Sequence, residues 1–107
     1  MKFGGNMKNL MKQATKMKQQ MEKLQNEVGE KTVEATAGGG MVTVVAKAKG
    51  EIASIKIEPD VVDPEDIEML QDLITAAVNE ALSKGQEMMQ EEVSKLTGGM
   101  GLPPGLI

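Results

Sequence analysis

A seven-residue repeat of apolar side chains near the N-terminus constrains the fold of this 107-residue chain more than any other feature. The repeat advances in alternating steps of three and four residues. Its members, called the apolar seam below, are Met7, Leu10, Ala14, Met17, Met21, Leu24 and Val28. This spacing puts them on one narrow stripe of an α-helix that packs against another helix. We therefore predict a helix over residues 6–28, which Gly29 ends.

Three short segments within residues 30–58 alternate polar and apolar side chains or are rich in Val and Ile, which is typical of β-strands. Gly38-Gly39-Gly40 separates the first segment from the second, and a turn around Gly50 separates the second from the third. Short glycine-containing connections favour hairpins. An antiparallel meander of three strands is therefore the simplest arrangement.

A second, longer helix is predicted over residues 64–97. Asp63 and Pro64 favour its start, because an acid caps free N–H groups and proline suits the first helical position. At about 1.5 Å per residue the helix would be on the order of 50 Å long, so part of it must project from a domain of this size. Gly85 lies where its apolar stripe thins. This predicts either a change of environment, with or without a bend, or a glycine tolerated on an exposed face.

We expect one α+β domain over residues 1–97, in the order helix, three-stranded antiparallel sheet, long helix. Residues 98–107 contain four Gly and two Pro, which favours a flexible tail. With one Phe and no Trp or Tyr, the core must come from aliphatic and Met side chains. Because aromatic side chains bury the largest areas, we expect additional burial against a second copy, and hence a homodimer.

Few side chains in this sequence could support catalysis. It has no Cys, His, Tyr or Arg, so thiolate nucleophiles, the commonest metal ligand and the commonest proton shuttle are excluded. None of the three Ser residues lies in a nucleophile-elbow pattern. The sequence therefore predicts a protein that is not an enzyme and that needs no cofactor, metal or small-molecule substrate.

Two local patterns have simple structural interpretations. The three consecutive glycines lack the Gly-Lys-Ser/Thr ending of a phosphate-binding loop, so a hairpin turn is preferred. The acidic run from Glu58 to Glu68 lacks the spacing of an EF-hand loop and is interpreted as a solvated loop and helix cap. No apolar run approaches the roughly 20 residues of a membrane span, and no secretory signal is evident. We expect a cytoplasmic protein with no membrane partner.

Charge is distributed unevenly along the chain. Residues 1–28 carry six Lys and two Glu, whereas residues 58–107 carry eleven acids and two Lys. The chain as a whole has a formal net charge of −4. A polyanionic partner should therefore meet the N-terminal helix.

Five lysines of that helix lie away from the apolar seam. In the heptad register that starts with Met7 at a, they occupy positions b, c, e and f: Lys8, Lys12, Lys16, Lys18 and Lys23. Like charges four residues apart cost a helix roughly a few tenths of a kcal/mol per pair, which an anion would relieve. A solvated helix face is the ordinary alternative. Without Arg, any binding of DNA should rest mainly on phosphate contacts.

Methionine content leaves a different function open. The chain has ten Met residues, and Met-rich surfaces adapt to varied apolar partners. The heptad helix and the Met88-Met89 pair could then form the groove of a protein-binding adaptor or chaperone-like module. Core packing and a dimer seam are the commoner roles of such residues.

Several segments, in the right order over almost the whole chain, resemble the YbaB/EbfC nucleoid-associated proteins. They are Met7-Lys8-Asn9-Leu10-Met11-Lys12-Gln13-Ala14, Ala37-Gly38-Gly39-Gly40, Lys49-Gly50-Glu51, Ile55-Lys56-Ile57-Glu58-Pro59 and Leu70-Gln71-Asp72-Leu73-Ile74-Thr75-Ala76-Ala77, with a Gly/Pro-rich tail. The resemblance implies a tweezer-like homodimer with projecting helices. It also implies a nucleoid-associated protein that binds duplex DNA, alters its conformation and influences nucleoid organisation and gene expression.

The DNA-binding role that the resemblance implies transfers here only to lysines of the first helix and its approach. These are Lys2, Lys8, Lys12, Lys16, Lys18 and Lys23. The second helix instead carries Glu87, Glu91 and Glu92 on its distal part, which argues against a DNA contact there.

Overall fold

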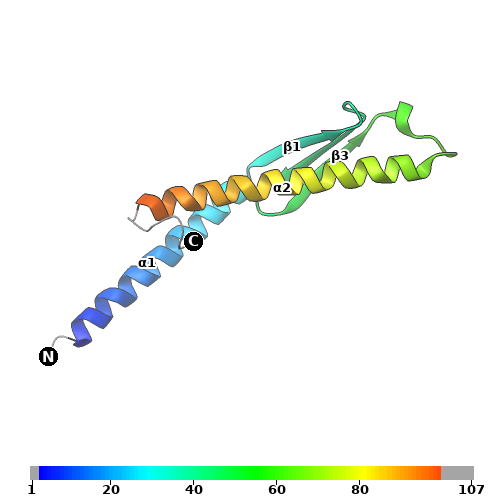
Figure 1. Cartoon of the computed structure of the whole chain (residues 1–107). Coiled ribbons are helices and arrows are strands. Elements are labelled where there is room, and N and C mark those ends of the chain that lie inside the picture. The colour runs from blue at the N-terminus through cyan, green and yellow to red at the C-terminus, as the bar shows by residue number, and fades with distance from the viewer. Residues whose placement is uncertain (1–2, 100–107) are drawn as a thin grey trace.

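The computed structural model describes residues 3–99, with side chains from Met7 to Leu96. Its elements are α1 (Phe3–Gly29), β1 (Thr32–Ala37), β2 (Val42–Lys47), β3 (Glu51–Ile57), the 3₁₀ turn η1 (Pro59–Val61) and α2 (Ile67–Gly99). Figure 1 shows α1 pointing away from the sheet, while α2 runs along the sheet and continues beside α1. The molecule measures 77 × 23 × 18 Å. This order of elements confirms the predicted α+β fold.

The three strands form one antiparallel sheet in the order β1-β2-β3. The first hairpin closes through Gly38, Gly39 and Gly40, whose φ angles are 65°, 67° and 93°. Residues that carry a Cβ rarely adopt this left-handed backbone conformation, so three glycines in succession suit the turn. The predicted hairpin is therefore confirmed. β3 contains an irregularity opposite Val45 and Ala46, where Ser54 and Ile52 are their partners and Ala53 is the extra residue.

The core lies between α2 and the sheet and consists of small side chains. Its fully buried cluster, each member at most 2% exposed, is Ala35, Val42, Val44, Ala46, Ala77 and Ala81. Alanine at two successive turns of α2 lets the helix backbone approach the sheet closely, and larger side chains such as Leu73 and Leu82 pack around this contact. α2 covers β1 and β2 but hardly touches β3. Ile55 of β3 consequently remains 45% exposed.

At Gly85, α2 packs directly against the backbone at the end of β2. The helix continues unbroken from Ile67 to Gly99, and Gly85 is buried. A Cβ atom at Gly85 would lie 3.2 Å from Lys47 O and 3.3 Å from the Ala48 Cα. The alternative of a glycine on an exposed face is wrong. The expected change of environment is correct, because beyond Gly85 the helix leaves the sheet and runs beside α1 (Figure 1).

The start of α2 differs from the prediction. Asp63 Oδ1 accepts a hydrogen bond from Glu65 N at 2.9 Å, and Asp63 O accepts one from Asp66 N at 2.9 Å, so Asp63 and Pro64 form a turn. Asp66 Oδ1 accepts from Met69 N at 3.3 Å and caps the helix instead. The predicted start at residue 64 is therefore wrong by three residues. The physical reason is that an acid followed by proline suits a turn as well as a helix start.

The helix ends also lie slightly outside the predicted limits. α1 spans Phe3–Gly29 against an expected 6–28, and α2 continues to Gly99, so the proposed tail cannot begin at Gly98. The tail residues 100–107 lie outside the described residues, as does Lys2.

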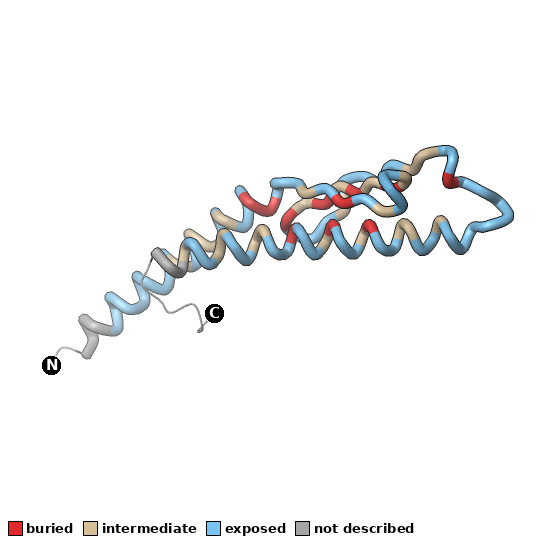
Figure 2. Tube along the Cα trace, turned by 45° about the horizontal axis from the view of Figure 1, so that its top comes forward, coloured by how far each residue is buried: buried red, intermediate tan, exposed pale blue. Residues whose placement is uncertain are grey.

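Burial along the apolar seam increases toward the sheet. Met7 and Leu10 are 66% and 63% exposed, Met17 and Met21 are half-buried, and Val28 is 4% exposed. Figure 2 shows the same gradient as the colour of the tube changes from blue through tan to red along α1. Within one chain the seam is therefore buried only from Met17 onward.

Candidate nucleic-acid interface

The junction between α1 and β1 determines the direction in which α1 leaves the sheet. Lys49 N donates to Gly29 O at 3.2 Å, and Ala48 N donates to Lys31 O at 2.8 Å. Gly29 is buried, and a Cβ there would lie 3.2 Å from the Cβ of Lys49. The end of α1 is thus hydrogen-bonded directly to the β2–β3 turn.

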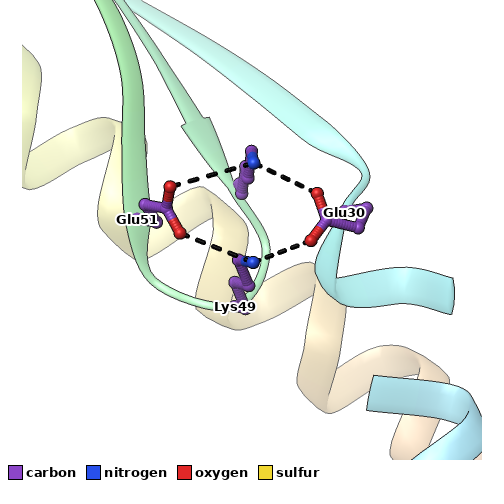
Figure 3. A network of polar contacts seen from close by, with 4 residues as sticks. Glu30, Lys49 and Glu51 are labelled. Atoms are coloured by element: carbon purple, nitrogen blue, oxygen red, sulfur yellow. Dashed lines mark hydrogen bonds and ion pairs between the residues drawn. The ribbon is translucent and has the colours of Figure 1, made fainter. Parts of the chain in front are cut away.

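Four charged side chains surround this junction, forming what we call the ionic cluster (Figure 3). Glu30 contacts Lys49 at 2.7 Å and Lys47 at 3.1 Å, and Glu51 contacts the same two lysines at 3.4 and 3.8 Å. The hydrogen bond from Lys49, followed by that from Lys47, lowers the pKa of the Glu30 carboxyl group. The hydrogen bond to Glu30 correspondingly raises the pKa of Lys49. The cluster joins α1 electrostatically to both strands of the second hairpin.

One side of α1 is an open basic groove. It is lined by Lys8, Met11, Lys12, Thr15, Lys16 and Gln19, and all six residues are exposed. The three lysines are spaced by four residues, so their side chains emerge on successive turns of the same face. An extended polyanion could contact all three at once.

Among the described side chains, no ion pair neutralises a lysine of α1. Within residues 7–96, each ion pair of a lysine involves Lys47, Lys49, Lys56, Lys84 or Lys95. The five α1 lysines have no carboxylate oxygen within 4 Å in this described part of the molecule. Their ammonium groups are available to an external anion.

The other side of α1 is an apolar groove along the seam. Leu10, Ala14, Met17 and Met21 line it, and Lys18 and Glu22 lie at its margin. Of the six candidate DNA-binding residues, the structure thus brings Lys8, Lys12 and Lys16 together. Lys18 borders the apolar groove, and Lys23 lies further toward the sheet, outside both grooves.

Comparison with known proteins identifies the family. Residues 3–100 match the model of the YbaB/EbfC DNA-binding family. The chain belongs to this family. A nucleoid-associated protein of Acetivibrio thermocellus is 64% identical over 104 residues, which cover 97% of this chain and 92% of that protein. A nucleoid-associated protein of Ruminiclostridium cellulolyticum is 58% identical over 104 residues, covering 97% and 90%.

A crystal structure of an uncharacterized protein from Helicobacter pylori has the same fold as this YbaB/EbfC chain. The TM-score is 0.61 at 24% identity, and the match covers 81% of this chain and 96% of that one. At this identity the likeness concerns the fold alone.

The distal part of α2 differs from α1 in its charge. Glu87 and Glu91 are exposed, while Glu92 pairs with Lys95 at 3.5 Å.

Among the described residues, no three acidic side chains gather closely enough to hold a metal ion. Neither described helix is long and apolar enough to cross a membrane. The basic groove of this family member lies on α1, in the part of the chain that the structure describes.

Sequence reasoning missed the ionic cluster. Glu30 and Lys49 are 19 residues apart, and only the chain reversal at Gly50 brings Lys47 and Glu51 to the same place. The alternation of Lys and Glu around that turn was the one available signal, and it does not reveal Glu30 as a partner.

Proposed function

We propose that this chain is a nucleoid-associated protein that binds duplex DNA through the basic groove of α1, mainly by phosphate contacts. The observation that carries the proposal is the row of Lys8, Lys12 and Lys16 on one exposed face, without an ion pair in the described part of the chain. Membership of a DNA-binding family supports it. The proposal includes no catalytic step.

The mode of binding follows from the chemistry of lysine. An ammonium group is a compact point charge that neutralises a phosphate but does not match base edges in the bidentate manner of Arg. Each neutralised phosphate releases counterions, so the logarithm of affinity should fall with the logarithm of salt at a slope near −0.9 per phosphate. Affinity should therefore be modest and strongly salt-dependent.

We also propose that the protein acts as a homodimer. Large apolar side chains remain exposed on β3, in the loop before α2 and at the start of α2, namely Ile55, Val62, Ile67 and Met69. Exposed apolar patches of this kind mark interaction surfaces, and a second copy would cover them. The dimer would hold two α1 helices as the arms of a tweezer, with about ten lysines facing DNA. Two arms on one duplex could change its conformation and thereby influence nucleoid organisation and gene expression.

Fluorescence anisotropy of labelled duplex DNA at two salt concentrations tests the DNA-binding proposal. The triple variant Lys8→Glu, Lys12→Glu, Lys16→Glu should lose binding while keeping its fold by circular dichroism. Its control, Lys31→Glu, Lys56→Glu, Lys95→Glu, makes the same change of net charge away from the groove and should bind far better. Equal loss in both variants would mean that total charge, not the groove, determines binding.

Sedimentation at micromolar concentration tests the dimer separately. We expect twice the chain mass of 11.4 kDa for the wild type and a shift toward the monomer for Ile55→Glu. A mass of one chain for the wild type would contradict the dimer without affecting the DNA-binding test.

The apolar groove supports a second candidate function, that of a protein-binding adaptor or chaperone-like module. Leu10, Met17 and Met21 line that groove, and Leu10 is 63% exposed. Absence of DNA binding by the folded wild type at low salt would favour this candidate. Binding of an apolar peptide that Met17→Glu abolishes would then support it directly.

A further inference from the structure

The centre of the outward face of α1 contains uncharged polar side chains between the lysines. In the heptad register Gln19 is at f, the position furthest from the seam, and Thr15 is at the adjacent position b. Lys8 and Lys12 occupy the same two positions one heptad earlier. Lys16 and Lys23, at c, lie to one side of these two rows, and Lys18, at e, lies to the other. Thr15 and Gln19 also line the basic groove. Around Thr15 and Gln19 the face thus has polar groups between flanking cations, and Lys8 and Lys12 continue the same two rows toward the N-terminus.

These polar groups are not used inside the molecule. Thr75 on α2 donates its hydroxyl to Gln71 O at 2.8 Å, as helical Thr residues often do. Within residues 7–96, the side chains of Thr15 and Gln19 have no hydrogen-bond partner, and both residues are exposed. Their donors and acceptors are free to meet a ligand that the lysines attract.

The dimensions of the face suit the major groove of DNA. That groove, about 12 Å wide, admits one α-helix, whose margins approach the phosphates while its centre approaches the base edges. Residues four apart on a helix are separated by about 6 Å along its axis, close to two base-pair steps of 3.4 Å. Thr15 and Gln19 could therefore address base pairs about two steps apart while the lysines contact the two strands.

We infer that Gln19 recognises adenine in the major groove, with Thr15 contacting a base about two steps away, and that this chain therefore prefers particular A·T-containing sequences. The Gln amide both donates and accepts, which matches the N6 donor and N7 acceptor of adenine. The inference rests on the proposed DNA-binding function and adds sequence discrimination to it. It also changes the expectation drawn from the absence of Arg, because Gln can read a base where Lys contacts only phosphate.

Selection from a library of random duplexes tests this inference. The wild type should enrich sequences with defined A·T pairs, and Gln19→Ala should not enrich the same ones. The affinity ratio between an enriched and a scrambled duplex should fall about five- to 150-fold in Gln19→Ala, the range expected for one bidentate base contact. Gln13→Ala is the matched control, because Gln13 lines the apolar groove of the same helix. It should enrich what the wild type enriches.

Replacing the enriched adenines with 7-deazaadenine, which lacks the N7 acceptor, distinguishes a base contact from an indirect effect. The wild type should lose affinity for the modified duplex, whereas Gln19→Ala should lose almost none, because its contact is already absent. Equal losses in both proteins would overturn the assignment to Gln19. Wild-type binding without any enrichment would overturn base reading but leave phosphate binding intact, whereas no binding to any duplex at low salt would overturn the proposed function itself.

Discussion

Two regions of the molecule differ in how completely they bury apolar side chains. The body is the sheet together with the part of α2 that covers it, residues 32–85, and the arm is helix α1. The body buries small side chains completely, and Val44 and Ala81 are both 0% exposed. The arm carries larger apolar side chains, yet Met7 and Met11 are more than 60% exposed. Figure 2 shows this contrast as a red interior beside a largely blue arm.

The difference shows which region one chain can stabilise alone. Two packed layers exclude water from the body, whereas the single helix of the arm gains burial near its C-terminal end, beside α2 and the β2–β3 turn. The arm is thus left to present its two faces to other molecules, with cations on one and methionines on the other. The proposed DNA contacts thus lie on the arm, whereas the fully buried core lies in the body.

A charge introduced into each region should produce the largest difference between the two regions in the free energy of unfolding. Ala81→Glu places a carboxylate in a fully buried site and should destabilise the protein by about 4 kcal/mol or more, enough to unfold it in mild denaturant. Ala14→Glu on the exposed arm should change the free energy of unfolding by no more than about 0.5 kcal/mol. Urea unfolding measures both. A comparable cost at Ala14 would show that the arm is packed in solution and would break the comparison.

The close approach at Gly85 should give the next largest effect. Gly85→Val introduces atoms against Lys47 O and the Ala48 Cα, and because these are backbone atoms α2 must shift, at about 1–3 kcal/mol. Ser83→Val on the exposed side of the same helix turn is the control for the intrinsic helix propensity of Val. A similar loss of stability in both variants would mean that the approach at Gly85 is unimportant.

One buried polar atom of the arm lacks a hydrogen-bond partner among the described residues, so replacing its side chain should raise stability. Gln20 Oε1 is buried and has no hydrogen-bond partner among the described residues. Because an unpaired buried polar group is unfavourable, Gln20→Met should raise stability by about 1 kcal/mol, while Gln13→Met on the exposed arm should not. Thermal unfolding compares them. A lower Tm for Gln20→Met would indicate that the amide is hydrated or paired in solution.

The ionic cluster should give the smallest effect, because its side chains are partly exposed and salt screens them. Glu30→Gln should lower Tm slightly at neutral pH, and the difference from wild type should shrink at high salt. The pKa of Glu30 is lowered in the folded state. The contribution of its carboxylate to the stability of the fold is therefore complete above the ordinary glutamate pKa of 4.5 and is lost as pH falls through the lowered value.

The contribution of Lys49 to the stability of the fold depends on pH in the opposite direction. Its pKa is raised, so its contribution is complete below the ordinary lysine value of 10.5 and is lost as pH rises through the raised value. The Tm difference between wild type and Glu30→Gln should therefore be greatest between these two limits. A difference that persists in strong acid would show that Glu30 acts through packing instead of charge.

Local periodicity made the elements predictable. The heptad of the arm, the alternation of the strands and the glycines at the hairpin depend on neighbours in sequence, so the α+β order and the opposition of Lys12 to Met17 followed from the sequence alone. The meeting of Lys8, Lys12 and Lys16 in one groove followed for the same reason, because residues four apart always share a helix face.

The tertiary structure decided what depends on residues distant in sequence. Whether Asp63 or Asp66 caps α2, why Gly85 must be small, and how Glu30 meets Lys49 all depend on where the sheet places its turns relative to the helices. The exposure of the apolar seam also depends on the tertiary structure, because the length of α2 beyond the sheet determines how much of the arm it can cover. Sequence periodicity specifies which face of a helix is apolar, whereas only packing in three dimensions determines whether that face is buried.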